Sequence, residues 1–203
     1  MKKRLIWLVP VLACASAVGL IDDNHTLRLE PAPKELHMRE GSFRVGPKTK
    51  IYVQLGHQSE DRIAAETLAE EVADRTGLQL EILGMKPEAK AQEGSIVLAR
   101  LEDKWVRRFL ARNGLMADES VGEDGYILFS DDEHLIVAAN SGEGLFYGVQ
   151  TLRQLLRPTN RGLVCPAVGI RDWPTPETFR VEEDVKRGTP TQLVRAPWRV
   201  PGS

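Results

Sequence analysis

Cysteine is nearly absent from this chain of 203 residues, which contains only Cys14 and Cys165. Cys14 falls within a segment that reads as an export signal, so the mature chain keeps too few thiols for a framework of internal disulfides. Cys165 lies in the apolar stretch Leu-Val-Cys-Pro-Ala. Such a setting favours a buried, unreactive thiol over a nucleophile.

An excess of charge of either sign is also missing. The 27 basic and 29 acidic residues are interspersed and give a formal net charge of −2. This balance leaves no basic face for a phosphate backbone and no polybasic membrane patch beyond the first residues. We therefore expect no nucleic-acid partner.

Motifs for metals and for nucleophilic catalysis are missing too. The 4 histidines (His25, His37, His57 and His134) are scattered and form no H-x-x-H, H-x-E or H-E-x-x-H pattern. No G-x-S-x-G turn and no Cys/His arrangement occurs. We expect no metal and no cofactor.

The N-terminus has the order of a secretory signal. Lys2, Lys3 and Arg4 precede the apolar run 5–13, which is too short to span a bilayer as a helix. Ala15-Ser16-Ala17 fits a cleavage site that ends a signal peptide at 1–17, while Val-Leu-Ala-Cys at 11–14 resembles a lipobox that would make Cys14 the lipidated first residue. Both remain open. An N-terminal helix of a cytosolic protein is the alternative, which Pro10 disfavours.

Export therefore places the protein in the periplasm, on the bacterial envelope as a lipoprotein, or outside the cell. Contact with a membrane is expected only through a lipid on Cys14.

Hydrophobic periodicity predicts one domain in which strands and helices intermix. The predicted helices cover 59–76, with Ser59 as its cap and Gly77 as its stop, 103–113 and 144–156. The predicted strands cover 35–38, 42–45, 51–55, 78–83, 95–99, and a hairpin of 126–129 with 135–139. Each helix has a single apolar face, so we expect a two-layer α+β domain with a mixed or antiparallel sheet and helices packed on one face.

Three glycines open the last helix and allow two interpretations. Gly142, Gly144 and Gly148 follow a strand, where backbone amides could hold an anion. The spacing is not G-x-G-x-x-G and no lysine follows, so a tight turn and close packing of the helix on the sheet explain these glycines better. Phe146 and Tyr147 are then expected to pack rather than to stack on a sugar.

Clusters of acidic residues occur at 118–119, 131–133 and 182–184. Each is expected to be a solvated charge rather than an acid/base pair.

The run 142–157, followed by Ile-Arg-Asp-Trp-Pro at 170–174 and by Phe179-Arg180, resembles the end of the N-terminal, non-catalytic domain of β-N-acetylhexosaminidases of glycoside hydrolase family 20. The resemblance begins at Pro31. It implies a hexosaminidase-like domain over 27–172, while 173–203 would be the truncated start of a catalytic barrel and an unpacked tail. A (β/α)8 barrel is then expected on the C-terminal side.

In that family an arginine early in the barrel contacts hydroxyls of the terminal N-acetylhexosamine, and Arg180 matches it. Asp184 and Arg187 are similar to the residues that follow, but Val181 stands where the family often has glycine. The resemblance thus implies that Arg180 is a substrate-binding residue.

The resemblance also implies substrate-assisted hydrolysis, in which an aspartate orients the 2-acetamido group and a glutamate protonates the leaving oxygen. The family's H-x-G-G-D-E type of motif does not occur here, so no catalytic residue is assigned. We expect an accessory domain of an exported β-N-acetylhexosaminidase-like glycoside hydrolase that is inactive alone. The alternative is a stand-alone, non-catalytic envelope module that binds a glycan or a protein.

Overall fold

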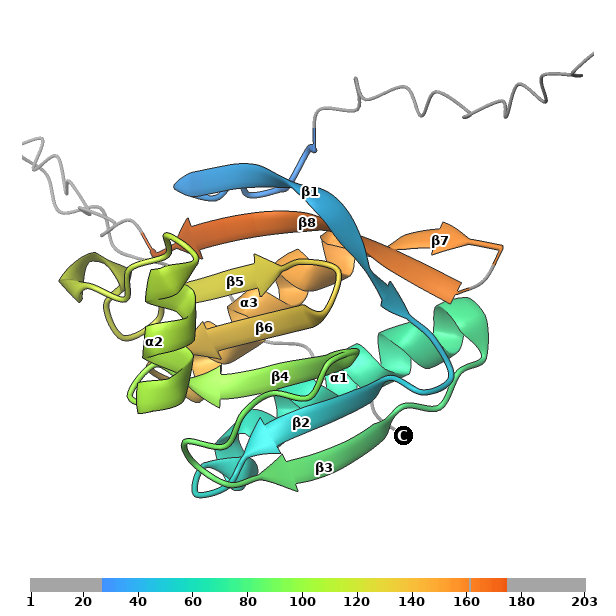
Figure 1. Ribbon diagram of the computed structural model, residues 1–203, viewed down its shortest axis with the longest axis horizontal. Coiled ribbons are helices and arrows are strands. Elements are labelled where there is room, and N and C mark those ends of the chain that lie inside the picture. Colours follow the sequence, from blue (N-terminus) through green and yellow to red (C-terminus); the bar gives the residue numbers. More distant parts are fainter. Residues whose placement is uncertain (1–26, 161, 175–203) are drawn as a thin grey trace, which may run out of the picture.

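The computed structural model describes residues 27–160 and 162–174, which form one mixed sheet with helices on both faces (Figure 1). The sheet has 8 strands, seven of them in the order β1-β8-β5-β6-β4-β2-β3, with β7 paired to β8. The strands are β1 Glu35–Val45, β2 Lys50–Gln54, β3 Glu81–Met85, β4 Ser95–Arg100, β5 Tyr126–Ser130, β6 His134–Ala139, β7 Arg157–Thr159 and β8 Gly162–Asp172. The helices are α1 Gln58–Thr76, α2 Lys104–Arg112 and α3 Gly142–Leu155, with a short 3-10 turn, η1, at Glu119–Val121. The predicted α+β class is confirmed.

The sheet changes character at β6. This strand pairs antiparallel with β5, as the predicted hairpin requires, and parallel with β4. Beyond β4, the strands β2 and β3 are also parallel, because α1 carries the chain between them. On the other side of β5, the strands β8 and β1 are antiparallel.

The strands predicted at 35–38 and 42–45 are one continuous strand, β1, with an irregularity between Met38 and Ser42. Gly41 adopts a φ of 102° there, and Pro166 of the neighbouring β8 pairs with Ser42 but has no N–H to donate. The Glu40-Gly41 pair therefore lies in a bulge within β1.

The helix ends agree largely with the sequence signals. Gly77 ends α1 in the left-handed conformation with a φ of 74°, as predicted. The predicted cap Ser59 is wrong, because α1 begins at Gln58, after His57, whose side chain makes no capping hydrogen bond. The side chains of Asp103 and Ser141 cap α2 and α3 by accepting hydrogen bonds from backbone N–H groups.

The helices do not all lie on one face of the sheet, so that part of the prediction is wrong. The core that contains α1 and α3 includes Leu128 and Val137, whereas the core that contains α2 includes Phe129 and Ile136. Neighbouring strand residues point to opposite faces, and Figure 1 shows α2 in front of the sheet with α1 and α3 behind it. All six residues of β4 are buried, which is the pattern of a strand covered on both sides.

Hydrophobic periodicity predicts no strand within residues 157–172, although β8 lies between β1 and β5 in the sheet. Pro158, Pro166, Gly162 and Gly169 interrupt the strand pattern there. Tertiary pairing with β1 and β5 overrides this weak local preference.

Among the described residues, no helix is long and apolar enough to cross a membrane.

Helix α3 approaches the sheet closely at Gly148. A Cβ atom at this position would lie 2.4 Å from Cγ1 of Val137 and 3.1 Å from the ring of Tyr126. Both neighbours are buried, and valine is stiff at χ1. The close packing expected from Gly148 is therefore confirmed.

We predict that Gly148→Ala lowers the free energy of unfolding by about 1–3 kcal/mol, because the new methyl group overpacks the contact between α3 and β6. Gly46→Ala is the matched control, since a Cβ atom there would have no neighbour within 4 Å. We expect the control to be neutral or to stabilise by about 0.4–1 kcal/mol. Urea unfolding followed by circular dichroism measures both, and equal effects of the two substitutions would contradict this packing.

Cys165 is completely buried, and burial raises the pKa of its thiol to about 12. In a Cys14→Ser variant, Cys165 is the only thiol. We predict that it does not react with Ellman's reagent at pH 8 in the native chain and reacts fully in urea, because the native thiol is both neutral and covered. Fast labelling of the native chain would show that the sheet does not cover Cys165.

Candidate functional site

A polar cluster marks the edge of the sheet where the parallel strands β2, β4 and β6 end. Arg100, the last residue of β4, is 3% exposed, and Asp61 in the first turn of α1 is fully buried. The guanidinium donates to Asp61 Oδ1 at 2.6 Å from Nη2 and to Asp61 Oδ2 at 3.2 Å from Nε. Nη2 also reaches Glu60 Oε2 at 2.7 Å. We call Arg100, Asp61 and Glu60 the edge cluster.

The edge cluster joins neighbouring strands. Arg100 Nη1 donates to the backbone oxygen of Asn140, directly after β6, at 2.8 Å. The backbone N–H of Arg100 donates to Gln54 Oε1 at the end of β2, also at 2.8 Å. Burial raises the pKa of the Asp61 carboxyl, and the hydrogen bonds from Arg100 oppose that shift. This arrangement binds the chain to itself.

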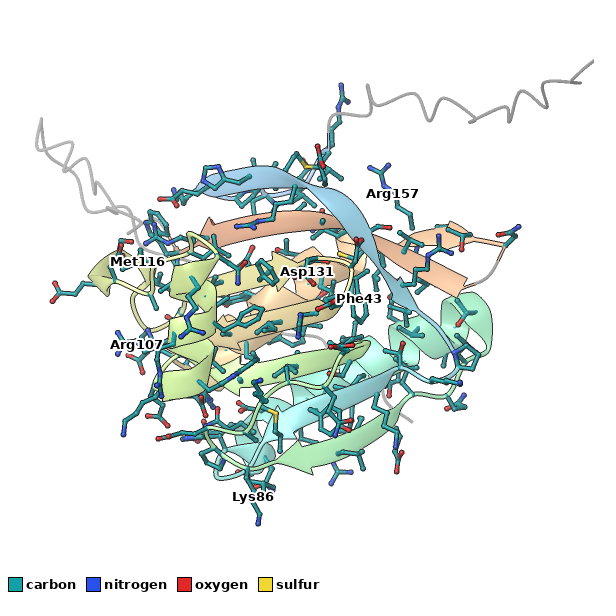
Figure 2. The ribbon with its side chains drawn as sticks, in the orientation of Figure 1. Phe43, Lys86, Arg107, Met116, Asp131 and Arg157 are labelled. Atoms are coloured by element: carbon teal, nitrogen blue, oxygen red, sulfur yellow. The ribbon has the colours of Figure 1, made fainter. Side chains whose placement is uncertain are left out.

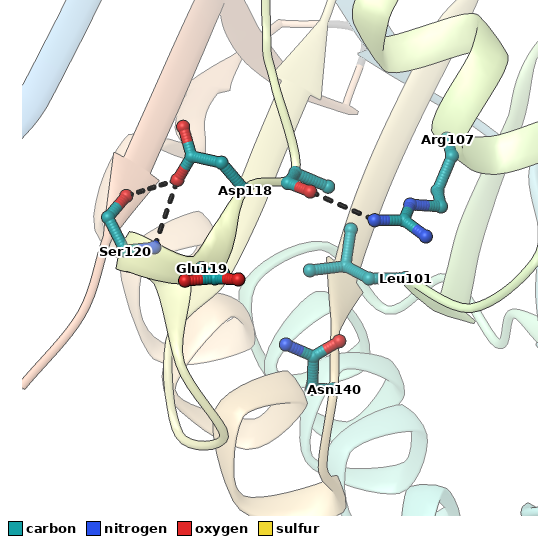
Figure 3. Close-up of a pocket in the computed structure, with 7 residues that line it drawn as sticks. Leu101, Arg107, Asp118, Glu119, Ser120 and Asn140 are labelled. Carbon is teal, nitrogen blue, oxygen red and sulfur yellow. Dashed lines mark hydrogen bonds between the residues drawn. The ribbon is translucent and has the colours of Figure 1, made fainter.

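An open cavity of about 690 Å³ lies beside this edge, where β4 and β6 end (Figure 3). Its lining consists of Leu101, Arg107, Ala117, Asp118, Glu119, Ser120 and Asn140. After β4 the chain passes to α2 on one face, while after β6 it passes to α3 on the other face. Such a divergence is where open α/β sheets bind their ligands.

Asp118 and Arg107 of this cavity make hydrogen bonds within the chain. Asp118 Oδ1 accepts from the N–H of Ser120 at 3.0 Å and from Arg171 Nη2 at 2.7 Å. These hydrogen bonds, led by the hydroxyl of Ser120, lower the pKa of Asp118. Arg107 Nη2 donates to the backbone oxygen of Ala117 at 3.1 Å (Figure 3). The contacts hold the loop around η1 against α2 and β8.

A second cavity, of about 400 Å³, lies at Trp173 and Pro174, the last residues that the structure describes. We call it the exit cavity. Trp173 and Pro174 line it together with Tyr126 of β5 and with Tyr147 and Thr151 of α3. Its lining also includes Glu30, Pro31, Ala32, Lys34, Asp124, Gln150, Gln154 and Asp172.

Hydrogen bonds fix the backbone at the exit cavity. Tyr126 Oη lies 2.6 Å from Thr151 Oγ1 and donates to Asp172 Oδ2 at 3.2 Å. Asp172 Oδ1 accepts from the backbone N–H of Lys34 at 3.1 Å. Burial raises the pKa of the Tyr126 hydroxyl, so the phenol stays protonated as a donor. Asp172 therefore connects the end of β8 to the start of β1 and to β5.

The predicted substrate-binding residue Arg180 and the lipidation candidate Cys14 lie outside the described residues, as do His25 and the acidic run 182–184. His57 lies between β2 and α1, whereas His134 is the first residue of β6, so the two imidazoles belong to opposite ends of the parallel strands. His57 pairs with Glu102 at 3.0 Å. Within residues 27–160 and 162–174, no three His, Cys, Asp or Glu side chains gather as metal ligands would.

The acidic run 131–133 is more than a solvated charge. Asp131 Oδ1 accepts from the N–H groups of Glu133 and His134, which closes the hairpin turn. Asp132 Oδ1 accepts from the N–H of Ser42 at 2.6 Å and so ties the hairpin to the bulge of β1. These roles require tertiary contacts that the sequence does not reveal.

The predicted turn at Gly142 and Gly144 is present, and no anion cradle is needed to explain it. Ser141 Oγ accepts from the N–H of Gly144 at 3.0 Å. A Cβ atom on Gly142 would lie 3.1 Å from Cβ of Glu60, so α3 packs tightly on α1 there. Phe146 packs partly against the core, whereas Tyr147 is 42% exposed, more than its expected packing role implies.

A family model described as "Glycosyl hydrolase family 20, domain 2" matches residues 26–173. The chain therefore belongs to glycosyl hydrolase family 20 and contains its domain 2. Among curated proteins, a beta-hexosaminidase of Porphyromonas gingivalis is 29% identical over 178 residues, which cover 82% of this chain and 20% of that protein.

Solved structures agree with this assignment. The family 20 β-N-acetylhexosaminidase of Streptomyces coelicolor matches with a TM-score of 0.52 and 28% identity, over 71% of this chain and 26% of that one. The β-N-acetylhexosaminidase of Bacteroides fragilis matches at 22% identity with a TM-score of 0.50, over 72% of this chain and 25% of that one, and supports the fold alone. The chain thus spans about a fifth to a quarter of the length of these proteins.

We predict that Arg100→Met lowers the free energy of unfolding by about 3–5 kcal/mol, because it leaves the buried Asp61 carboxylate without its partner. Arg62→Met is the matched control, since the side chain of Arg62 is 73% exposed and pairs with Glu66 one turn away. We expect the control to lose less than about 1 kcal/mol.

Adding Asp61→Leu to Arg100→Met removes the unpaired charge and should recover part of the loss. Urea unfolding of the four proteins measures these differences. A loss for Arg100→Met no larger than that for Arg62→Met would contradict the role of the edge cluster.

Proposed function

We propose that this chain is the N-terminal, non-catalytic accessory domain of an exported β-N-acetylhexosaminidase. A catalytic (β/α)8 barrel on its C-terminal side would hydrolyse terminal N-acetylhexosamine residues. The match of residues 26–173 to domain 2 of family 20 is the observation that carries the proposal. The relatives are about four to five times as long as the part that this chain matches, since the chain covers 20% of the P. gingivalis protein and 26% of the S. coelicolor structure.

The hydrogen bonds of Asp61, Asp118 and Asp172 support a structural role for these three carboxylates. A glycosidase needs acidic groups that face a bound sugar. Asp61 has the raised pKa of a general acid, but it is fully buried and bound to Arg100, so a substrate cannot reach it. Asp118 and Asp172 border open cavities and already accept hydrogen bonds from Arg171, and from Tyr126 and Lys34, respectively.

Export is supported by the sequence of the N-terminus alone. The basic residues 2–4, the apolar run 5–13 and the small residues that follow have the order of a secretory signal. A hydrolase of terminal N-acetylhexosamine outside the cytoplasm would meet envelope or extracellular glycans.

The open cavity of about 690 Å³ favours a second candidate, a stand-alone module that binds a glycan without turnover. Arg107, Ser120 and Asn140 offer hydrogen-bonding groups there beside the apolar Leu101. This function requires saturable binding of N-acetylglucosamine oligomers by the purified chain.

We predict that the purified 203-residue chain releases no p-nitrophenol from p-nitrophenyl N-acetyl-β-D-glucosaminide, whereas a protein extended through the DNA downstream of Ser203 does. The reason is that the acid pair of the proposed reaction would lie in the barrel. The control is the extended protein with the glutamate of its barrel Asp-Glu motif replaced by glutamine, which should be inactive. Release by the 203-residue chain alone would contradict the accessory role.

A further inference from the structure

Helix α2 ends on a dipeptide that serves the fold and is also chemically reactive. Asn113 is the C-terminal cap of α2, and Gly114 follows in the left-handed conformation with a φ of 79°. This conformation favours glycine and ends the helix. Asn113 is also the only asparagine of the chain that precedes a glycine. Because glycine has no Cβ atom, its backbone nitrogen reaches the preceding side-chain amide with the least steric hindrance.

The reaction of such a pair is deamidation by water. The deprotonated backbone nitrogen of Gly114 attacks Cγ of Asn113, a C–N bond forms, and the Cγ–Nδ2 bond breaks as ammonia leaves. Water then opens the cyclic imide at either carbonyl group and gives aspartate or isoaspartate. The chain and water are the only reactants.

The folded chain holds the peptide group between Asn113 and Gly114 from both sides. Nη2 of Arg39, on β1, donates to the backbone oxygen of Asn113. The N–H of Gly114 donates to the backbone oxygen of Ala111 at 3.1 Å. Because a peptide group is planar, these two hydrogen bonds together fix its rotation.

This fixed geometry opposes the reaction at each reacting atom. Ring closure requires the peptide group to rotate about the Cα–C bond until the Gly114 nitrogen faces the Asn113 side chain, whereas the observed ψ of 13° turns that nitrogen away. The leaving group is held as well, since Nδ2 of Asn113 donates to the backbone oxygen of Phe109 at 2.9 Å. The imide can therefore form only after the end of α2 has opened.

We propose that Asn113 is a latent deamidation site that Arg39 keeps closed in the folded chain. Arg39 is itself held in place, because its guanidinium carbon lies 5.1 Å from the centroid of the Phe129 ring, within the range of a cation–π contact. The clamp joins β1 to α2, so it exists only when β1 has paired into the sheet. This inference is independent of the function proposed above.

Solvent lies close to this end of α2. Gly114 is exposed, and Met116 is 57% exposed at the rim of the molecule beside α2 (Figure 2). Leu115 between them is buried and packs on β8, where a Cβ atom on Gly169 would lie 3.1 Å from its Cδ2. An opening that frees Arg39 and Leu115 thus exposes the Asn-Gly pair directly to water.

Deamidation makes such an opening permanent. The product has a carboxylate in place of the amide that donates to the backbone oxygen of Phe109. This negative charge lies at the C-terminus of α2, where the helix dipole disfavours it. In isoaspartate the main chain also gains a methylene group, so Arg39 and Ala111 no longer meet the same peptide group.

Peptide mapping by mass spectrometry tests the site, after incubation of the 203-residue chain in mildly alkaline buffer with and without urea. Cleavage after glutamate gives the peptide 103–119, in which Asn113 is the only side-chain amide, and the peptide 134–143, in which Asn140 is the only one. In urea we expect Asn113 to deamidate several-fold faster than Asn140, because Ser141 hinders the attack more than Gly114 does. A rate at Asn113 no higher than that at Asn140 overturns the assignment of the site.

The same measurement tests the protection by the fold. Without urea we expect deamidation at Asn113 to be several-fold slower than in urea. Equal rates at Asn113 in the two conditions overturn the protection.

A pair of variants tests the clamp. Arg39→Met should raise the rate at Asn113 in the native chain several-fold and leave the rate in urea unchanged, because the unfolded chain has no clamp. Arg44→Met is the matched control, since Arg44 is exposed on the same strand, and it should change neither rate. Circular dichroism shows whether each variant is folded, and an unchanged native rate in folded Arg39→Met overturns the role of Arg39.

The urea dependence of the unaltered chain gives an independent measurement that does not require Arg39→Met to fold. A rate at Asn113 that rises at urea concentrations below the unfolding transition supports a local opening at the end of α2. A rate that rises only with global unfolding overturns the local clamp.

Discussion

The buried pair between Arg100 and Asp61 is the interaction on which the rest of the fold depends. Arg100 ends β4, and its contacts reach β2 through Gln54, the end of β6 through Asn140, and α1 through Asp61. A buried carboxylate and guanidinium are tolerated only when each satisfies the other and the remaining donors find acceptors. Arg100 meets this condition with Glu60 and the backbone of Asn140. The cluster therefore fixes how the parallel half of the sheet meets the helix that covers it.

Different elements cover the two faces of the sheet. On one face, α2 and the loop around η1 cover β5 and β6, with Arg171 and Asp118 securing the loop. On the other face, α1 and α3 bury their inner sides in the core, and Gly142 and Gly148 allow close approach to α1 and to the sheet.

Elements whose sequence signals lie within one short segment are predicted correctly, whereas features that depend on tertiary contacts are not. The three helices and the hairpin are predicted because periodicity, Gly77 and the polar turn act within one element. The side on which α2 packs is not predicted, because an apolar stripe says that a helix is buried but not on which face of the sheet. Strand β8 is not predicted because Pro166, Gly162 and Gly169 interrupt its hydrophobic pattern.

The contacts at the exit cavity are not predicted either. They join Lys34, Tyr126, Thr151 and Asp172 from four separate parts of the chain, and no local sequence pattern connects these residues. The resemblance to family 20, which combined glycines, aromatics and the Asp-Trp-Pro turn, is confirmed by the family match.

The most direct test of the account is to sequence the DNA that follows the codon for Ser203. We predict that this DNA encodes, in some reading frame, a (β/α)8 barrel with the family's His-x-Gly-Gly-Asp-Glu type of motif. The proposed accessory role requires that barrel. A stop codon followed by sequence without such a motif in any frame would contradict the account and would favour a stand-alone binding module.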